Sequence, residues 1–158
     1  LKVINSLVKK KIDFQYWWIG SGELDKQVQK YIDDNCLNDY VKLFGSCDDV
    51  SSLYQAMDIF FLPSLFEGLP ITAIEAQAAG LPCVISDSVT KELAYTDLVQ
   101  FVSLNVSADA WSNELIKQSK RKINRAEYLH DLKRSPFYSP NASVLLSNYY
   151  SELTKRLS

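Results

Sequence analysis

The chain has 158 residues, a length that suits one compact domain, and its 47% hydrophobic and 23% charged residues exclude an intrinsically disordered chain. A net charge of -2 argues against a broad nucleic-acid-binding surface. No apolar run reaches the roughly 20 residues that a membrane-spanning helix requires.

The first part of the sequence alternates helix-like and strand-like segments. Apolar residues three or four positions apart predict helices, and runs of β-branched or aromatic residues predict strands. Asp48 and Asp49 precede a helix-like run, so one of them is expected to cap that helix. The predicted elements here are a helix over residues 1–11, a strand over 14–19, an amphipathic helix over 23–36, a strand over 41–44 and a helix that begins near residue 50.

The later part of the sequence continues this alternation and then becomes helical. Pro70 in the first turn and Gly80 just past the end delimit a helix over residues 70–79. The other predicted elements are strands over 59–62, 83–85 and 99–102, and helices over 108–120, 125–133 and 141–157. We expect residues 1–158 to form a single domain whose C-terminal helices span about residues 108–158.

Strands that alternate with helices at this spacing predict βαβ units. The expected fold class is therefore α/β, with a Rossmann-like parallel sheet sandwiched by helices. Ligands of such sheets bind at the carboxyl ends of the strands. The candidate functional loops are those that follow Ile19, Phe44, Leu62 and Ile85.

The loop after Leu62 leads to two glutamates on either side of a predicted helix start. Glu67 lies before the helix and Glu75 more than one turn inside it, which puts the carboxylates roughly 10 Å apart along the axis at about 1.5 Å per residue. Between them lie free N–H groups and the positive end of the helix dipole. Gly68 lets a ligand approach the backbone closely. The arrangement matches a sugar linked through a diphosphate to a ribose.

Either glutamate alone also fits a simpler interpretation. Glu67 can be a first-turn charge that complements the helix dipole, and Glu75 a solvated helix residue. Glu75 is harder to explain in this way, because Ile71, Ile74 and Ala76 surround it with apolar or small neighbours. A carboxylate buried among such neighbours needs a partner.

Two shorter loops are also candidates. The glycine turn at residues 20–22 follows a predicted strand and precedes a predicted helix, so its backbone can approach a phosphate or a sugar. Asp25 stands where a dinucleotide fingerprint has its third glycine, and a plain strand-to-helix turn is an open alternative. Phe44 and Gly45 end the next strand and can frame a flat base, although a core ring and a turn glycine fit equally well.

The remaining reactive residue types give weaker indications. The single histidine, His130, gives little support to a catalytic triad or a metal site. Three cysteines without CxxC spacing predict buried or half-buried thiols in a reducing cytosol rather than a disulfide framework or a zinc site; they are Cys36, Cys47 and Cys83. The chain begins at Leu1, without a methionine and inside a predicted helix, so we expect it to be a piece of a longer protein.

Taken together, these loops resemble the C-terminal, donor-binding domain of glycosyltransferase family 4, a large family of retaining enzymes with the GT-B fold. The matching segments are WWIGSGELDKQV (residues 17–28) and FEGLPITAIEAQAAGLPCV (66–84), within a resemblance that covers about residues 1–115. The seven-residue gap between Glu67 and Glu75 is a specific signature. The likeness is greatest to bacterial capsular and exopolysaccharide glycosyltransferases.

The resemblance implies a role for each matching position. Glu67 is the expected catalytic residue, which contacts the donor sugar, and Glu75 is expected to hold the ribose hydroxyls. No metal or cofactor is expected, because a helix dipole and basic residues neutralise the phosphates in this family. The other implied donor-binding residues are Gly68 and Leu69 as backbone donors to the diphosphate, Gly20 and Gly22 at the floor of the site, Ser64 beside the first glutamate, and Phe44, Gly45 and Asp49 at the base-binding edge.

The resemblance also implies an overall activity. A hexose would pass from a nucleotide sugar, with a UDP-sugar as the expected donor, to a growing capsular polysaccharide, exopolysaccharide or lipid-linked oligosaccharide, with retention at the anomeric carbon. The expected location is the cytoplasm, with peripheral association of the full-length protein at the inner face of the cell membrane. The acceptor-binding N-terminal domain and an Arg/Lys pair that neutralises the diphosphate would precede Leu1, so we expect this chain alone to be inactive.

Two alternatives to a transferase stay open. One is another GT-B enzyme, a sugar-nucleotide epimerase or a phosphorylase; Lys91 is the only lysine in the four candidate loops that could carry the pyridoxal phosphate of a phosphorylase. The other is a non-enzymatic module that binds a nucleotide and interacts with other proteins.

Overall fold

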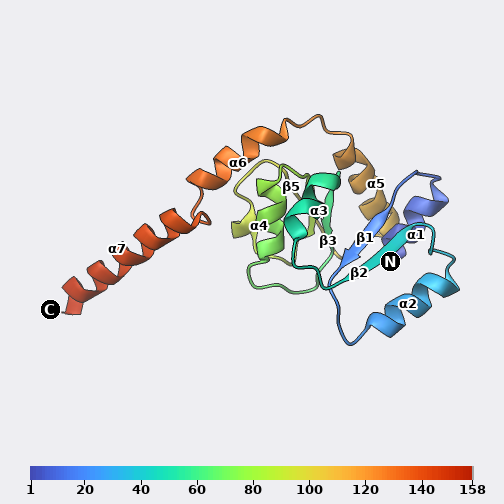
Figure 1. The fold of residues 1–158 in the computed structure, drawn as a ribbon, viewed down its shortest axis with the longest axis horizontal. Helices are drawn as coiled ribbons and strands as arrows, with labels where there is room; N and C mark the ends of the chain where they lie inside the picture. The colour runs from blue at the N-terminus through green and yellow to red at the C-terminus, as the bar shows by residue number, and fades with distance from the viewer. Residues whose placement is uncertain (158) are drawn as a thin grey trace.

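The structure is a computed structural model that describes the backbone of residues 1–157 and the side chains of residues 1–155. Helices and strands alternate as far as β5, and three helices follow (Figure 1). The elements are α1 (Lys2–Lys9), β1 (Tyr16–Ile19), α2 (Asp25–Asp34), β2 (Val41–Gly45), α3 (Val50–Ala56), β3 (Phe60–Leu62), α4 (Ile71–Ala78), β4 (Cys83–Ser86), the 3-10 helix η1 (Lys91–Leu93), β5 (Val99–Val102), α5 (Ala108–Ser119), α6 (Arg125–Arg134) and α7 (Ser139–Leu157).

The strands are all parallel, which confirms the predicted α/β fold class. β1 pairs with β2, and β4 lies between β3 and β5. The hydrogen-bonded strands thus form two parallel sheets rather than one continuous ladder. An aromatic contact connects the two sheets, with the ring centroids of Tyr16 in β1 and Phe61 in β3 lying 6.2 Å apart.

Strand β4 is buried on both faces, as a strand covered by helices on two sides must be. Because successive side chains of a strand point to opposite faces, its residues divide between two clusters. Val84 belongs to the cluster that contains Trp111 of α5, whereas Cys83 and Ile85 belong to the cluster that contains Ala73 of α4. The sandwich of helices predicted from the sequence is therefore present around β4.

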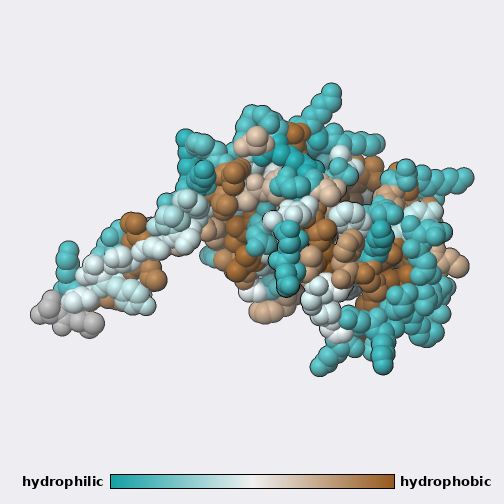
Figure 2. Space-filling model, viewed as in Figure 1, coloured by the Kyte–Doolittle hydropathy of each residue, from teal (hydrophilic) through white to brown (hydrophobic). Residues whose placement is uncertain are grey.

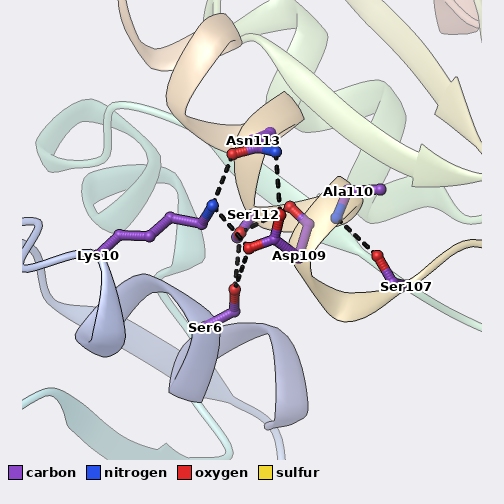
Figure 3. A network of polar contacts seen from close by, with 7 residues as sticks. All are labelled: Ser6, Lys10, Ser107, Asp109, Ala110, Ser112 and Asn113. Carbon is purple, nitrogen blue, oxygen red and sulfur yellow. Dashed lines mark hydrogen bonds and ion pairs between the residues drawn. The ribbon is translucent and has the colours of Figure 1, made fainter.

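Helix α1 is attached to α5 by a polar network (Figure 3). The Lys10 ammonium lies 2.6 Å from the Asp109 carboxylate and donates a hydrogen bond to Asn113. Ser6 donates to Asp109 as well and lies 2.9 Å from the Ser112 hydroxyl. Segments about one hundred residues apart in sequence are thereby held together, so the helix at the start of the chain is part of the fold.

Helix α6 passes very close to the end of α4. Gly80 has a φ of +71°, as expected for a glycine just past a helix end. A Cβ added there would lie 2.6 Å from the Cα of Arg125, so only glycine allows α6 this approach. Arg125 in turn donates hydrogen bonds to the carbonyl oxygens of Gln55 and Met57 at the end of α3. The contact therefore connects α6 with both α3 and α4.

Helix α7 extends away from the rest of the chain (Figure 1). Its exposed apolar side chains include Val144, Leu145 and Leu146, and Figure 2 shows apolar atoms along this projecting helix. Over residues 1–157 no helix has both the length and the apolar character needed to cross a membrane. Ser158, the last residue of the predicted C-terminal helical region, lies outside the described residues.

One prediction about the cysteines is wrong. Cys83 is buried and Cys47 half-buried, as expected, but Cys36 is exposed. It follows the C-cap of α2 with a φ of +53°, where the chain turns at the surface toward β2. All three cysteines are free thiols.

Candidate functional site

The centre of the candidate site is the start of α4, which follows the loop at the carboxyl end of β3. Pro70 is the N-cap and has no side-chain hydrogen bond to the helix, while its carbonyl accepts from the Ala73 amide at 3.0 Å. No side-chain cap therefore covers the first turn, whose amides and positive dipole end are suited to an anion. Gly68, two residues earlier, has nothing within 4 Å of an added Cβ, so the backbone here is open.

Glu67 has a defined orientation in this loop. The Ser64 hydroxyl donates a hydrogen bond of 2.8 Å to Glu67 Oε1, and both residues are half-buried. The two residues between them, Leu65 and Phe66, are 82% and 84% exposed. The structure thus brings together two of the predicted site residues and directs the carboxylate by a polar contact.

Glu75 lies on the exposed side of α4, which agrees with the simpler interpretation of a solvated helix residue rather than with a carboxylate buried among apolar neighbours. The helix buries Ala73, Ile74, Ala76 and Gln77 on its other side. Glu75 nevertheless has a protein partner, because the hydroxyl of Tyr54 in α3 lies 3.3 Å from its Oε2. Burial, and then the negative charge of Glu75, raise the pKa of Tyr54, so this hydroxyl stays protonated as a donor.

The sequence reasoning missed the contact of Tyr54 with Glu75. Its side chain is 4% exposed, and a tyrosine hydroxyl at such depth requires a hydrogen-bond partner. This rule could have predicted from the sequence that a buried Tyr54 needs a hydrogen-bond partner, but not that the partner is Glu75.

A buried polar network missed by the sequence reasoning anchors α4 on its other side. Gln77 is fully buried, donates to the carbonyl oxygens of Ala73 and Leu93, and accepts from the Thr96 hydroxyl at 2.9 Å. The Tyr95 hydroxyl donates to the Ile74 carbonyl at 3.1 Å. These contacts fix the helix that carries Glu75 to the segment between β4 and β5.

The glycine turn after β1 meets the end of β2. The Gly20 amide donates a hydrogen bond of 2.7 Å to the Gly45 carbonyl, and the hydroxyls of Ser21 and Ser46 lie 2.8 Å apart. Gly20 and Gly45 have φ values of +123° and +65°, which L side chains rarely adopt. Two loops that were predicted separately therefore form one unit.

Three predicted residues of these loops already have partners within the chain. The Gly22 amide donates to the Asp25 carboxylate at 3.0 Å. Phe44 is 39% exposed and its ring packs 5.2 Å from that of Trp17, so part of the ring is open. Asp49 caps α3 by accepting from the Ser52 amide, and the hydroxyls of Ser52 and Ser51 also donate to it.

The hydrogen bonds to Asp49 affect its ionisation. They come first from the Ser52 hydroxyl and then from the Ser51 hydroxyl, and they lower the pKa of Asp49 to about 2. Since α3 begins at this cap and carries Tyr54, the helix connects the loop after β2 with Glu75.

The loop after β4, another of the candidate loops, is a largely polar connection. Asp87 and Ser88 are exposed, and Lys91 is exposed at the start of η1. His130 is likewise exposed, on α6. Among the described residues, no cluster of three or more His, Cys, Asp or Glu side chains is arranged to hold a metal ion.

Comparison with known sequences identifies similar proteins. The family model described as "Glycosyl transferases group 1" matches residues 1–119. The "Putative glycosyltransferase EpsF" of Bacillus subtilis (strain 168) is 30% identical over 158 residues, which cover 99% of this chain and 41% of EpsF. An Escherichia coli "UDP-Gal:alpha-D-GlcNAc-diphosphoundecaprenol alpha-1,3-galactosyltransferase" is 40% identical over 70 residues, 44% of this chain and 18% of that protein. The chain thus spans well under half the length of either relative.

Solved structures show the same fold at low sequence identity. The lipopolysaccharide outer core galactosyltransferase WaaB matches with a TM-score of 0.75 and 20% identity, over 96% of this chain and 44% of that one. The pneumococcal O-GlcNAc transferase GtfA, in complex with UDP and GlcNAc, matches with a TM-score of 0.70 and 18% identity, over 99% of this chain and 32% of that one. These likenesses agree with the parallel α/β architecture and confirm the predicted fold of GT-B glycosyltransferases.

Proposed function

Because the chain belongs to the glycosyl transferases of group 1, we propose that it is the donor-binding domain of a retaining family 4 hexosyltransferase that uses a UDP-sugar. The whole protein would transfer the hexose to a bacterial exopolysaccharide, a capsular polysaccharide or a lipid-linked oligosaccharide. EpsF is named as a glycosyltransferase, and the Escherichia coli relative is named for a UDP-Gal donor and a diphosphoundecaprenol-linked acceptor. GtfA, which has the same fold, was solved with UDP.

The observation that carries the proposal is the open start of α4 between two oriented carboxylates. The backbone amides of Gly68 and Leu69 and the helix dipole suit a diphosphate, which leaves as an anion when the sugar is transferred. Glu67, directed by Ser64, would orient the sugar and stabilise the positive charge that develops on it. Glu75 would accept hydrogen bonds from the ribose hydroxyls.

The unit formed by the glycine turn and the end of β2 would hold the remainder of the nucleotide. Gly20 and Gly22 would form the floor of the site, and the open part of Phe44, with Gly45, would border the base. Asp49 already accepts hydrogen bonds from two serines, so we assign it the role of shaping this loop and starting α3.

The rest of the reaction would use other parts of the protein and of the cell. We assign acceptor binding to the part of the full-length protein that corresponds to the unmatched part of the relatives. The basic residues that neutralise the diphosphate are assigned to the same part. In this scheme the helix dipole and those basic residues would stabilise the leaving diphosphate without a metal. A lipid-linked acceptor, such as the one named for the Escherichia coli relative, would put the reaction in the cytoplasm at the inner face of the membrane.

The test is an assay of the full-length protein with a panel of UDP-hexoses and an undecaprenyl-diphosphate-linked saccharide. We expect one UDP-hexose to give a glycosylated product, and NMR of its anomeric proton to show the donor's configuration retained. Inversion would contradict the proposed mechanism. Interconversion of UDP-sugars without transfer would instead identify an epimerase, and absence of UDP binding would favour an interaction module.

A further inference from the structure

The hydroxyl of Tyr54 lies between two acceptors of α4. It is 3.3 Å from Glu75 Oε2 and 3.2 Å from the carbonyl oxygen of Thr72. A tyrosine hydroxyl has a single hydrogen, so the two oxygens share one donor. Thr72 and Glu75 are three residues apart and lie on the same side of the helix. Tyr54 therefore attaches the Glu75 side chain to the first turn of its own helix.

The ring of Tyr54 cannot easily move from this position. Its side chain is 4% exposed, and its centroid lies 6.3 Å from that of Phe60 in β3, at an interplanar angle of 63°. Its helix α3 is held at both ends, by the Asp49 cap and by the bonds from Arg125 to the Gln55 and Met57 carbonyl oxygens. The donor that meets Glu75 is thus rigidly placed.

An exposed glutamate on a helix ordinarily samples several rotamers, and binding a ligand with it costs the entropy of ordering the side chain. The bond from Tyr54 engages Oε2 and restricts this freedom before a ligand arrives. It leaves Oε1 to accept hydrogen bonds from a ribose. Such preorganisation raises affinity without the tyrosine touching the ligand.

We propose that Tyr54 is a positioning residue that preorganises Glu75 for the ribose hydroxyls of the nucleotide. The inference rests on the proposed function, since it assumes that Glu75 binds the ribose. It adds that the affinity for those hydroxyls depends on a buried hydroxyl from another helix. Its consequence is specific to the ribose, because the hydrogen bonds of the Tyr54 hydroxyl go to Thr72 and Glu75 of α4 and not to the Glu67 loop or the turn at residues 20–22.

The test compares two nucleotides on the full-length protein by calorimetry: UDP, and 2′,3′-dideoxy-UDP, which lacks both ribose hydroxyls. Tyr54→Phe removes the hydroxyl and keeps the ring that packs on Phe60. We expect about fivefold weaker UDP binding, the size of one lost hydrogen bond of moderate strength, and unchanged binding of the dideoxy nucleotide. In a Glu75→Ala background, Tyr54→Phe should have no further effect, because coupled residues are not additive.

Tyr95→Phe is the matched control. Tyr95 also donates to a backbone carbonyl of α4, that of Ile74, but its hydroxyl bond goes to no carboxylate. It should leave the affinity for both nucleotides unchanged, and thermal melting should confirm that all variants are folded. If Tyr54→Phe weakens both nucleotides equally, or if Tyr95→Phe matches its effect, Tyr54 has only a general structural role.

The outcomes also separate this inference from the proposed function. Unchanged UDP affinity in Tyr54→Phe, together with weaker binding by Glu75→Ala, would overturn the positioning role and leave the proposed function intact. Absence of UDP binding by the wild-type protein would overturn the proposed function itself.

Discussion

Ser64 and Glu67 are joined by a hydrogen bond of 2.8 Å from the serine hydroxyl to Glu67 Oε1. The bond closes the loop between β3 and α4 across two residues whose apolar side chains are mostly exposed. The loop conformation therefore depends on a polar contact rather than on burial. The carboxylate is directed by a neighbour three residues away, just before the helix whose positive end suits a diphosphate.

Replacing Glu67 with glutamine tests its role in the reaction. Glu67→Gln keeps an oxygen that accepts from Ser64 but removes the charge that would stabilise the developing positive charge on the sugar. We expect turnover by the full-length protein to fall by about 100-fold or more. Thermal melting should be unchanged, and Glu152→Gln on the projecting α7 should retain full turnover. Normal turnover in Glu67→Gln would remove this residue from the mechanism.

Adding a methyl group at Gly68 separates ligand binding from folding. An added Cβ has nothing within 4 Å, and the residue has no positive φ, so Gly68→Ala should leave the melting temperature close to that of the wild type. We expect weaker UDP binding, since the methyl group would occupy space at the open start of α4. Calorimetry and thermal melting measure the two effects. Wild-type affinity in a folded variant would mean that the diphosphate lies elsewhere.

Gly80 and Gly45 provide a comparison of two causes of destabilisation. Gly45→Ala introduces only backbone strain, because its φ is +65° and an added Cβ meets nothing, so we expect a loss of about 1 kcal/mol in unfolding free energy. Gly80→Ala adds a contact of 2.6 Å with the Cα of Arg125 to a similar φ of +71°. It should be clearly the more destabilising in chemical denaturation. Equal losses would show that α6 can move away from α4 at little cost.

The cap formed by Asp49 has a defined pH dependence. Its folded pKa of about 2 lies below the ordinary aspartate pKa of 3.8, so the folded chain binds this proton less readily than the unfolded chain. The stabilisation is present above about pH 4 and is lost as the pH falls through about 2. The melting temperature of Asp49→Ala should lie below that of the wild type at neutral pH, and the difference should shrink between pH 4 and 2. Asp48→Ala, at the neighbouring aspartate that is not the N-cap of α3, is the matched control.

Much of the fold follows from local patterns in the sequence. Apolar spacing, the aspartate before α3 and the glycine after α4 indicated where elements begin and end, and the structure confirms Asp49 as the cap and Gly80 in a left-handed conformation. The contact between Gly20 and Gly45 could also be expected from the sequence. Each glycine lies at the end of a predicted strand, and neighbouring parallel strands end at the same edge of their sheet.

The contacts that orient the site could not be predicted in the same way. Helical spacing indicates that Tyr54 faces the interior, but not that its hydroxyl reaches an exposed carboxylate on α4. Gln77 looks like an ordinary polar helix residue, and it is fully buried only because Leu93 and Thr96 supply its partners from beyond β4. The sequence left open whether Glu75 is solvated or buried, and it is exposed because Ile74 and Ala76 pack on the other side of the helix while Ile71 is itself exposed. Each case depends on how separate elements pack together.

The most direct test of the central claim is a calorimetric titration of the full-length protein with UDP, for the wild type, Glu75→Ala and the control Glu152→Gln. We predict saturable binding by the wild type and the control. Glu75→Ala should bind about tenfold more weakly or worse, because it loses hydrogen bonds to a charged acceptor. Unaltered affinity in a folded Glu75→Ala protein, or no UDP binding by the wild type, would contradict the claim that Glu75 and the start of α4 hold the nucleotide-sugar donor.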